Sequence, residues 1–334
     1  MNPCDFSHKK PPSYPLTIYA TLWEQYRESF KELAVAYLLL TWAAVFWGGN
    51  YVVGHILVQY VDPYGLSLIR WGGTTLLMFA LYWKTFVQDY PALRRQLRMN
   101  TLFSLLGQVS FPLSLYIGLQ YTTSLNASIY ISSTPCLVLL INYFIFRERI
   151  SGRNILGVIA STAGVIYLAF SNAKGASSLQ AFGWGDVLTI VSALSWAFYC
   201  ALLRLKNKEV KNTSFVAFSS LIGTIILVPM YWLHATFSQD FHGMIYTVLP
   251  PVIAGILYLI IFPSWLSYVF WNKGVSLIGT TRSEIYTHLI PISGGIMGIA
   301  FLGNTLETYH LITLLLIVFG IVCCSAKNLA TEKI

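Results

Sequence analysis

The chain has 334 residues, of which 56% are hydrophobic and only 10% are charged, and its formal net charge is +8. Soluble domains carry about a quarter charged residues, because water must wet their surface. This composition excludes a soluble globular protein and predicts a chain embedded in a lipid bilayer. The basic residues lie in short segments between apolar runs, which favours a role in membrane topology over binding to nucleic acid.

Apolar stretches long enough to cross a bilayer, about 20 residues each, recur along the chain. Ten of them are found, at residues 33–56, 64–83, 100–119, 123–146, 154–171, 186–204, 213–233, 249–271, 279–302 and 308–326. The sequence therefore predicts an all-α membrane protein with ten transmembrane helices.

The basic residues predict the orientation of these helices. When loops are assigned alternately to two sides, 18 of the 21 Lys and Arg residues fall on the side that holds both termini. Only Lys174 lies on the other side, while Arg70 and Arg282 fall within spans. Because basic loops stay in the cytoplasm, we expect both termini to be cytoplasmic.

The two ends of the chain lie outside the predicted spans. Residues 1–32 lack the pattern of a signal peptide, and their apolar residues recur at helical spacing. This pattern predicts a cytoplasmic segment with an interfacial amphipathic helix, serving as a tether or as a regulatory element. Residues 327–334 are predicted to be a cytoplasmic tail.

The chain repeats part of its own sequence. Residues 116–164 match residues 272–320 at a constant offset of 156. The matching pairs are Gly118 with Gly274, Tyr130 with Tyr286, Pro135 with Pro291 and Gly164 with Gly320, and earlier in the chain Trp47 resembles Trp196.

This internal match predicts two five-helix repeats, at residues 33–171 and 185–326, joined by an external linker at 172–184. An odd number of spans per repeat reverses the orientation of the second repeat in the membrane. Such inverted repeats are typical of carriers that expose one central site alternately to the two sides.

Several short motifs follow one another in the order and spacing of a known family. They are Trp47-Gly48-Gly49-Asn50-Tyr51, Asp62-Pro63 with Arg70, Phe146-Arg147-Glu148-Arg149, Gly185-Asp186 with Ser195-Trp196-Ala197, and Arg282 with Leu289-Ile290-Pro291-Ile292. Over nearly all of residues 33–326, the chain resembles the ten-span EamA-type branch of the drug/metabolite transporter superfamily.

This resemblance implies a carrier in the bacterial cytoplasmic membrane that moves amino acids, related metabolites or drugs, often outward. It also implies a central cavity lined mainly by the first, third, fourth, sixth, eighth and ninth spans. The chain departs from the family after the ninth span, where Asn304 replaces the acid that would match Glu148. It also carries Glu284 where the family commonly has a small residue.

Ionisable residues within the ninth span are candidates for function, because a charge at the centre of a span costs roughly 3 kcal/mol to insert. On an α-helix, Glu284 and His288 share one face and Arg282 and Tyr286 share another. Glu284 and His288 could bind an ammonium group or relay a proton. The alternative is that Arg282 and Glu284 pair with each other or with lipid headgroups at the cytoplasmic end.

Polar residues in other spans allow two interpretations each. Arg70 could bind a substrate carboxylate, but a structural pairing is favoured, and Glu148 is also assigned a structural role. Asn50 and Gln108 could face the cavity or bridge helices.

Prolines and aromatic residues complete the predicted site. Pro135 and Pro291 would interrupt the middle of a helix and are predicted to be paired hinges, the alternative being tolerated kinks. The aromatic candidates for lining the cavity, which could instead serve packing, are Tyr130, Tyr286, Trp47, Trp196, Trp265 and Tyr268.

These observations together predict a secondary transporter for a small, amino-acid-like metabolite, working by alternating access as an exporter and sufficient as a monomer. Import or exchange, for example of S-adenosylmethionine, and a receptor or scaffold are the alternatives. Coupling to protons and facilitated diffusion are both compatible with the sequence. The five cysteines and six histidines have no ligand spacing and no catalytic cluster appears, so we expect no metal, no cofactor and no enzyme activity.

Overall fold

The computed structural model describes residues 16–148, 151–174, 182–238, 241–279 and 283–325. These residues form helices joined by short turns and loops. The described part contains no β-strand, only an isolated bridge between Val61 and Ile245. The predicted all-α class is confirmed.

The helices up to residue 174 include several that follow one another end to end. They are α1 (Leu16–Leu57), α2 (Pro63–Arg95), α3 (Leu97–Ser104), the π-helical segment η1 (Leu105–Ser110), α4 (Phe111–Gly118), α5 (Ser124–Ile131), α6 (Thr134–Phe146) and α7 (Gly152–Lys174).

The later helices show the same arrangement. They are α8 (Trp184–Leu202), the 3₁₀ turn η2 (Leu203–Leu205), α9 (Asn212–Phe237), α10 (Pro250–Leu259), the π-helical segment η3 (Ile260–Leu266), α11 (Ser267–Ile278), the 3₁₀ segment η4 (Glu284–His288), α13 (Leu289–Leu302) and α14 (Thr308–Ser325).

Six helices are long and apolar enough to cross a membrane. They are Lys31–Leu57, Leu97–Gly118, Ser124–Phe146, Trp184–Leu205, Asn212–Phe237 and Pro250–Ile278. The other four predicted stretches are helical as well, in α2, α7, α13 and α14. The chain is therefore a helical membrane protein with at least six apolar spans, while the number ten stays a prediction.

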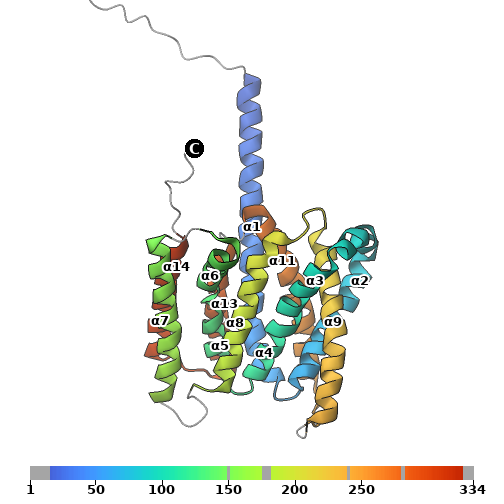
Figure 1. Cartoon of the computed structure of the whole chain (residues 1–334), viewed down its shortest axis with the longest axis vertical. Coiled ribbons are helices and arrows are strands. Elements are labelled where there is room, and N and C mark those ends of the chain that lie inside the picture. The colour runs from blue at the N-terminus through green and yellow to red at the C-terminus, as the bar shows by residue number, and fades with distance from the viewer. Residues whose placement is uncertain (1–15, 149–150, 175–181, 239–240, 280–282, 326–334) are drawn as a thin grey trace, which may run out of the picture.

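The N-terminal segment is helical from residue 16 onward and runs directly into the first span. It is part of α1, one helix of 42 residues that extends out of the bundle (Figure 1), and its interfacial position stays a prediction. The reason is local: no Gly or Pro interrupts the sequence between Leu16 and Trp47, so nothing ends the helix at the edge of the bundle.

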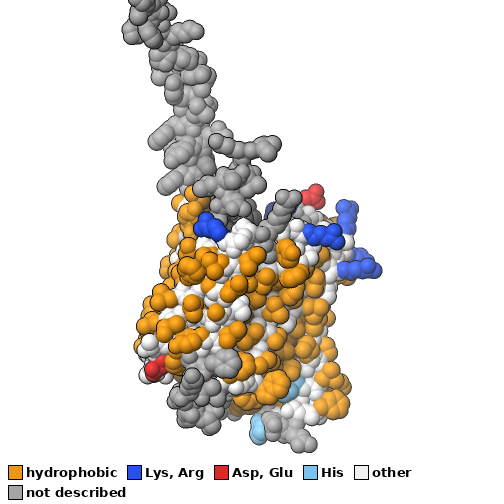
Figure 2. Space-filling view, turned by 60° about the vertical axis from the view of Figure 1, so that its left-hand side comes forward, with side chains coloured by type: hydrophobic (Ala, Val, Ile, Leu, Met, Phe, Trp, Pro, Cys, Tyr) orange, Lys and Arg blue, Asp and Glu red, His pale blue; other side chains and the backbone are white. Residues whose placement is uncertain are grey.

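The helices pack around α1, which lies near the middle of the bundle in Figure 1. It contacts α11 and α13, while α7 pairs with α14 at one edge and α2 with α9 at the other. One continuous cluster of buried apolar residues joins α1, α2, α4, α8, α9 and α11. The long apolar side surface and the basic residues at the end from which α1 protrudes are visible in Figure 2.

The crossing of α1 and α13 depends on glycine. A Cβ atom added at Gly48 would lie 2.0 Å from the Ser293 hydroxyl oxygen and 2.7 Å from the backbone nitrogen of Gly294. Backbone atoms cannot move aside easily, so only a residue without a side chain allows this close approach. The two helices therefore pack backbone against backbone at this point.

We expect Gly48→Ala to lower the free energy of unfolding by about 1–3 kcal/mol, because the added methyl group overpacks the crossing. Gly72→Ala is the matched control, since its added Cβ would meet only Thr224 Cγ2, at 3.8 Å. Thermal unfolding of the purified variants measures both effects. Equal melting temperatures for the two variants would contradict the close crossing.

Candidate functional site

A fully buried arginine, Arg70, lies two turns inside α2. The helix begins before it because Asp62 caps the N-terminus, accepting a hydrogen bond from the Gly65 backbone nitrogen at 2.9 Å, and Pro63 follows at the first helical position. With a rise of about 1.5 Å per residue, this start places Arg70 roughly 10 Å along the helix. The guanidinium is thus carried away from the helix end into the bundle.

Neutral groups from three other elements hold the Arg70 guanidinium. Its Nη1 donates to the Asn50 side-chain oxygen at 3.0 Å and to the Tyr116 hydroxyl at 2.7 Å, and its Nε donates to the Ser264 hydroxyl at 2.5 Å. The Tyr116 hydroxyl in turn donates to the Asn50 oxygen at 2.9 Å. Arg70 therefore links α2 to α1, α4 and η3.

The charge of Arg70 has no carboxylate partner among the acidic side chains that the structure describes. Its Nη2 atom is buried and has no hydrogen-bond partner among the described residues, and the same holds for Asn50 Nδ2. Buried cations are normally paired with an acid, since desolvation of an isolated charge is costly. The site thus offers unused donors beside a positive charge, the arrangement that an anionic group would complete.

Aromatic rings surround the Arg70 site. Trp71 lies under the guanidinium, with 5.2 Å between the guanidinium carbon and the ring centroid. The Trp47 ring lies 4.9 Å from that of Trp196, and Trp196 stacks on Tyr199 at the same centroid distance. We define the aromatic cluster as the six buried residues Trp47, Trp71, Trp196, Tyr199, Tyr268 and Trp271.

The two π-helical segments supply backbone oxygens to this cluster. The Tyr268 hydroxyl donates to the carbonyl oxygen of Gly107 in η1 at 2.6 Å. The Trp47 indole donates to the carbonyl oxygen of Pro263 in η3 at 2.9 Å. A π-turn disrupts the regular backbone ladder, and such turns are common at functional sites. Both segments therefore position aromatic side chains as well as contributing polar atoms.

The structure brings together several of the predicted site residues. Trp47, Asn50, Trp196 and Tyr268 all lie in the aromatic cluster or against Arg70. Gln108 is buried in η1, next to Gly107, and neither its amide oxygen nor its amide nitrogen has a hydrogen-bond partner among the described residues.

Other predicted residues lie away from this centre. Tyr130 belongs to a second buried cluster with Ile317 of α14. Tyr286 stacks on Tyr37 with 5.8 Å between ring centroids, and Trp265 is half-buried near Tyr82. These aromatic residues do not contact Arg70 or the aromatic cluster through any described ring contact.

The ninth span differs most from its prediction. Residues 284–288 form a 3₁₀ helix, so residues four apart no longer share a face, because a 3₁₀ helix has about three residues per turn. The α-helical spacing assumed for Glu284 and His288 does not hold for this backbone, and the role of the two side chains stays a prediction. His288 has two buried ring nitrogens without a partner among the described residues, while Arg282 and the side chain of Glu284 lie outside the described part.

The predicted hinge and structural residues are placed as follows. Pro135 lies in the first turn of α6, after a break at residues 132–133, and Pro291 lies in the first turn of α13, after η4. Each proline thus begins a new helix rather than kinking a continuous one, since the first turn needs no proline N–H. Glu148 pairs with Arg204 at 2.6 Å.

Sequence reasoning missed Tyr116, Ser264 and Trp71, although all three contact Arg70. Tyr116 is the first residue of the internal sequence match, but nothing in that match predicted that its hydroxyl binds Arg70. Ser264 reaches Arg70 through the π-turn of η3, and a π-turn rotates side chains relative to the α-helical pattern read from sequence.

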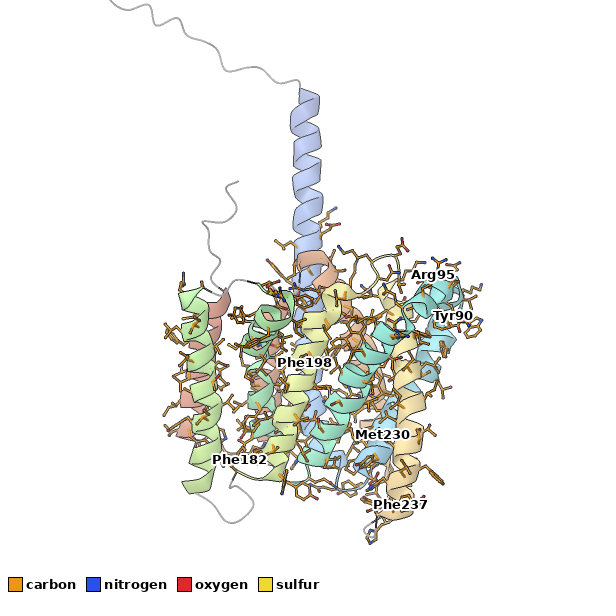
Figure 3. The ribbon with its side chains drawn as sticks, in the orientation of Figure 1. Tyr90, Arg95, Phe182, Phe198, Met230 and Phe237 are labelled. Carbon is orange, nitrogen blue, oxygen red and sulfur yellow. The ribbon has the colours of Figure 1, made fainter. Side chains whose placement is uncertain are left out.

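A separate pocket of about 840 Å³ lies at the end where the basic residues gather. Asn272 of α11 lines it and is also within 3.4 Å of the Tyr199 hydroxyl, which belongs to the aromatic cluster. Figure 3 marks this end of the molecule by Arg95 and Tyr90, and the opposite end by Phe182 and Phe237. The pocket thus lies at this end of the molecule and reaches the aromatic cluster through Asn272.

Comparison with known proteins decides the family. Residues 34–170 and 183–326 each match the EamA-like transporter family. The chain belongs to this family. It is 25% identical to the uncharacterized transporter YetK of Bacillus subtilis, over 87% of both chains, and 27% identical to an uncharacterized transporter of Archaeoglobus fulgidus, over 87% of this chain and 98% of that one.

A more distant relative is a WAT1-related chloroplastic protein of Arabidopsis thaliana, 24% identical over 80% of this chain and 64% of that protein. The fold is similar to that of a protein of known crystal structure, with a TM-score of 0.58 and 16% identity over 87% of this chain and 96% of that one. The protein is thus a membrane transporter, in agreement with the names of its relatives from Bacillus subtilis and Archaeoglobus fulgidus.

We expect Tyr116→Phe to lower the free energy of unfolding of the transporter by about 1.5–3 kcal/mol, because the lost hydroxyl binds a charged group. Tyr258→Phe is the control, since its hydroxyl donates to the neutral carbonyl oxygen of Phe46 at 3.0 Å. The control should lose only about 1 kcal/mol. Thermal unfolding in detergent compares the two, and an equal loss would contradict a charge-bearing Arg70 site.

Proposed function

We propose that the protein is a secondary transporter that binds the carboxylate of a small, amino-acid-like solute at Arg70. The observation that carries this proposal is the unused Nη2 of Arg70, buried beside a positive charge that no described carboxylate neutralises. With Nε and Nη1 engaged by Ser264, Asn50 and Tyr116, Nη2 keeps N–H groups that can donate charge-assisted hydrogen bonds to a carboxylate. A solute carboxylate would supply the missing counter-charge.

The surroundings of Arg70 would strengthen this interaction. Hydrogen bonds to a charged group contribute about 1.5–3 kcal/mol each where water is excluded. The aromatic cluster supplies that water-poor environment and offers ring faces to the rest of the solute. An ammonium group on the solute would bind those faces by cation–π contact, about 0.5–2 kcal/mol. An amino acid combines both groups at a short spacing.

Alternating access by two inverted repeats of five spans, ten in all, is the proposed mechanism of transport. Three observations support it. The family matches the chain twice, in its two halves. The offset of 156 residues carries η1 onto residues 261–266, which lie within η3. Trp47 and Trp196, matched between the halves, are in edge-to-face contact.

We further propose a bacterial cytoplasmic membrane, cytoplasmic termini and outward transport. Export is favoured because the 840 Å³ pocket lies at the basic, inward-facing end and adjoins the aromatic cluster through Asn272. Coupling to protons through His288 or Glu284 belongs to the same proposal, and so do hinges at Pro135 and Pro291.

The variant Asn50→Asp tests the Arg70 proposal directly. It places a carboxylate of the same shape 3.0 Å from the guanidinium, where it neutralises the charge that the solute would otherwise meet. We expect normal or higher thermal stability but at least a tenfold weaker solute affinity in proteoliposomes, since about 1.4 kcal/mol already corresponds to tenfold.

Asn50→Ala is the control, because it removes the same amide without adding an acid. We expect this variant to lose stability but to keep its preference for carboxylate-bearing solutes across a panel of amino acids and their amides. Wild-type transport by Asn50→Asp would remove Arg70 from substrate binding and overturn the proposed site.

The proposed orientation can be tested by labelling. In a cysteine-free background, a cysteine at Arg95 should react with a membrane-impermeant maleimide only from the cytoplasmic side, and one at Phe237 only from outside. Both side chains are exposed and lie at opposite ends of the molecule (Figure 3). Labelling of both positions from one side would contradict the topology, whatever the fate of the Arg70 site.

A further inference from the structure

The pocket at the basic end is lined by an unusual concentration of cations. We call it the cytoplasmic vestibule; its polar lining includes Arg204, Lys206, Lys208, Lys211, Lys273 and Asn272. No carboxylate among the described residues lines it, although the exposed Glu209 lies between Lys208 and Val210 in the chain. Its volume of about 840 Å³ is large enough for a small organic molecule.

The rule that basic residues stay in the cytoplasm explains their side of the membrane but not their grouping. Arg94, Arg95 and Arg98 lie at the same end, exposed and outside the vestibule. The vestibule instead gathers five cations from the α8–α9 connection and α11 around one hollow. Like charges that line one hollow repel one another, and an anion bound among them would offset this repulsion.

Nearby acids neutralise only part of this charge. Glu148 pairs with Arg204 at 2.6 Å from outside the lining. Asp89 of α2 accepts a hydrogen bond from the backbone nitrogen of Lys211 at 3.1 Å and attracts the Lys206 ammonium. The remaining lysines, Lys208 and Lys273, are exposed and have no ion pair with a described carboxylate.

Lys206 is fixed in a position to bind an anion. Its Nζ donates to the Val210 carbonyl oxygen at 3.1 Å and to the Asn212 side-chain oxygen at 2.7 Å, which leaves one of its three N–H bonds free. Burial lowers the pKa of Lys206 to about 8, although Asp89 acts in the opposite direction. An anion beside Lys206 would favour the charged form of its amine. Near that pH, Lys206 would therefore take up a proton when the anion binds.

The inner wall of the vestibule reaches the aromatic cluster through Asn272. Asn272 is 97% buried and its Nδ2 has no hydrogen-bond partner among the described residues, while its oxygen faces the Tyr199 hydroxyl. Tyr199 stacks on Trp196 of the aromatic cluster. Asn272 and Tyr199 thus connect the lining of the vestibule to the aromatic cluster.

From this geometry we infer that the cytoplasmic vestibule is a binding site for small organic dianions of the dicarboxylate type. It holds the solute before the aromatic cluster opens, so the transported solute carries a second acid beside the carboxylate that Arg70 binds. This inference rests on the proposed function for the second step, but binding in the vestibule itself does not require Arg70.

The test compares succinate with butyrate, two four-carbon acids that differ in one carboxylate. The full-length transporter is placed in nanodiscs of phosphatidylcholine, and binding is followed by calorimetry at low ionic strength. We expect saturable succinate binding at least tenfold tighter than that of butyrate. Binding should weaken from pH 7 to pH 9, because Lys206 loses its charge as the pH rises through about 8, and it should weaken with salt.

The double variant Lys208→Gln/Lys273→Gln should weaken succinate binding at least fivefold, and Lys206→Gln should remove most of the change between pH 7 and pH 9. Arg94→Gln/Arg95→Gln is the matched control, because it removes two exposed charges from the same end outside the vestibule, and we expect less than a twofold change. All positions except Lys206 are exposed, so the folding of these variants should be normal.

Equal weakening by the two double variants would reduce the effect to general surface charge and overturn the inference, as would equal affinities for succinate and butyrate. An effect seen only in discs that contain phosphatidylglycerol would assign the vestibule to lipid headgroups and also overturn it. The Asn50→Asp variant separates the two proposals: it should keep vestibule binding while losing transport. Loss of vestibule binding with intact, Arg70-dependent transport would reject this inference alone.

Discussion

A buried guanidinium that no carboxylate of the described residues neutralises is the constraint on which the centre of this transporter depends. Arg70 is fully buried in a bundle whose outer surface faces lipid, so water cannot solvate its charge. Three neutral oxygens, from Asn50, Tyr116 and Ser264, and the faces of neighbouring aromatic rings spread the charge without cancelling it. The neutral partners hold the cation without neutralising it, so under the proposed function a ligand carboxylate can bind there reversibly. A fixed internal acid would satisfy the arginine and remove the attraction.

The irregular helices make this arrangement possible. A regular α-helix uses its backbone oxygens internally, so a spanning helix normally offers a binding site only side chains. The two π-helical segments free the oxygens of Gly107 and Pro263 for Tyr268 and Trp47, and η3 also turns Ser264 toward Arg70. Because the freed oxygens bind aromatic residues of other helices, the backbone defects tie the helices together. The segments that break the helical pattern are therefore the ones that build the site.

The sequence predicted the helices far better than it predicted the site, and the reason is physical. Each predicted span lies on a helix, because a run of consecutive apolar residues long enough to cross the bilayer can be recognised from the local sequence alone. The sequence also indicated Trp47, Asn50, Trp196 and Tyr268 as candidates for the centre, since they carry bulky or polar groups in apolar spans. Tyr116 and Ser264 were not, because their roles depend on π-turns and helix crossings. The prediction that Glu284 and His288 share a helix face assumed α-helical spacing, and residues 284–288 instead form the 3₁₀ helix η4.

Aromatic rings alone could bind either a cationic solute or the apolar part of an acidic one. The charges around the central site distinguish between these two classes. A cationic drug or sulfonium could gain about 0.5–2 kcal/mol from cation–π contact with the cluster. A positive group about 5 Å from Arg70 would be repelled by roughly 3 kcal/mol at an effective dielectric constant of 20, which exceeds that gain. For a carboxylate, the electrostatic interaction with Arg70 is attractive. An ammonium group on the same solute is favourable only on the side away from Arg70, against the aromatic rings. The vestibule lysines would add repulsion for cations and attraction for acids at that end of the molecule. Under the proposed function, an acidic or zwitterionic solute therefore matches the charges of both sites better than a purely cationic one.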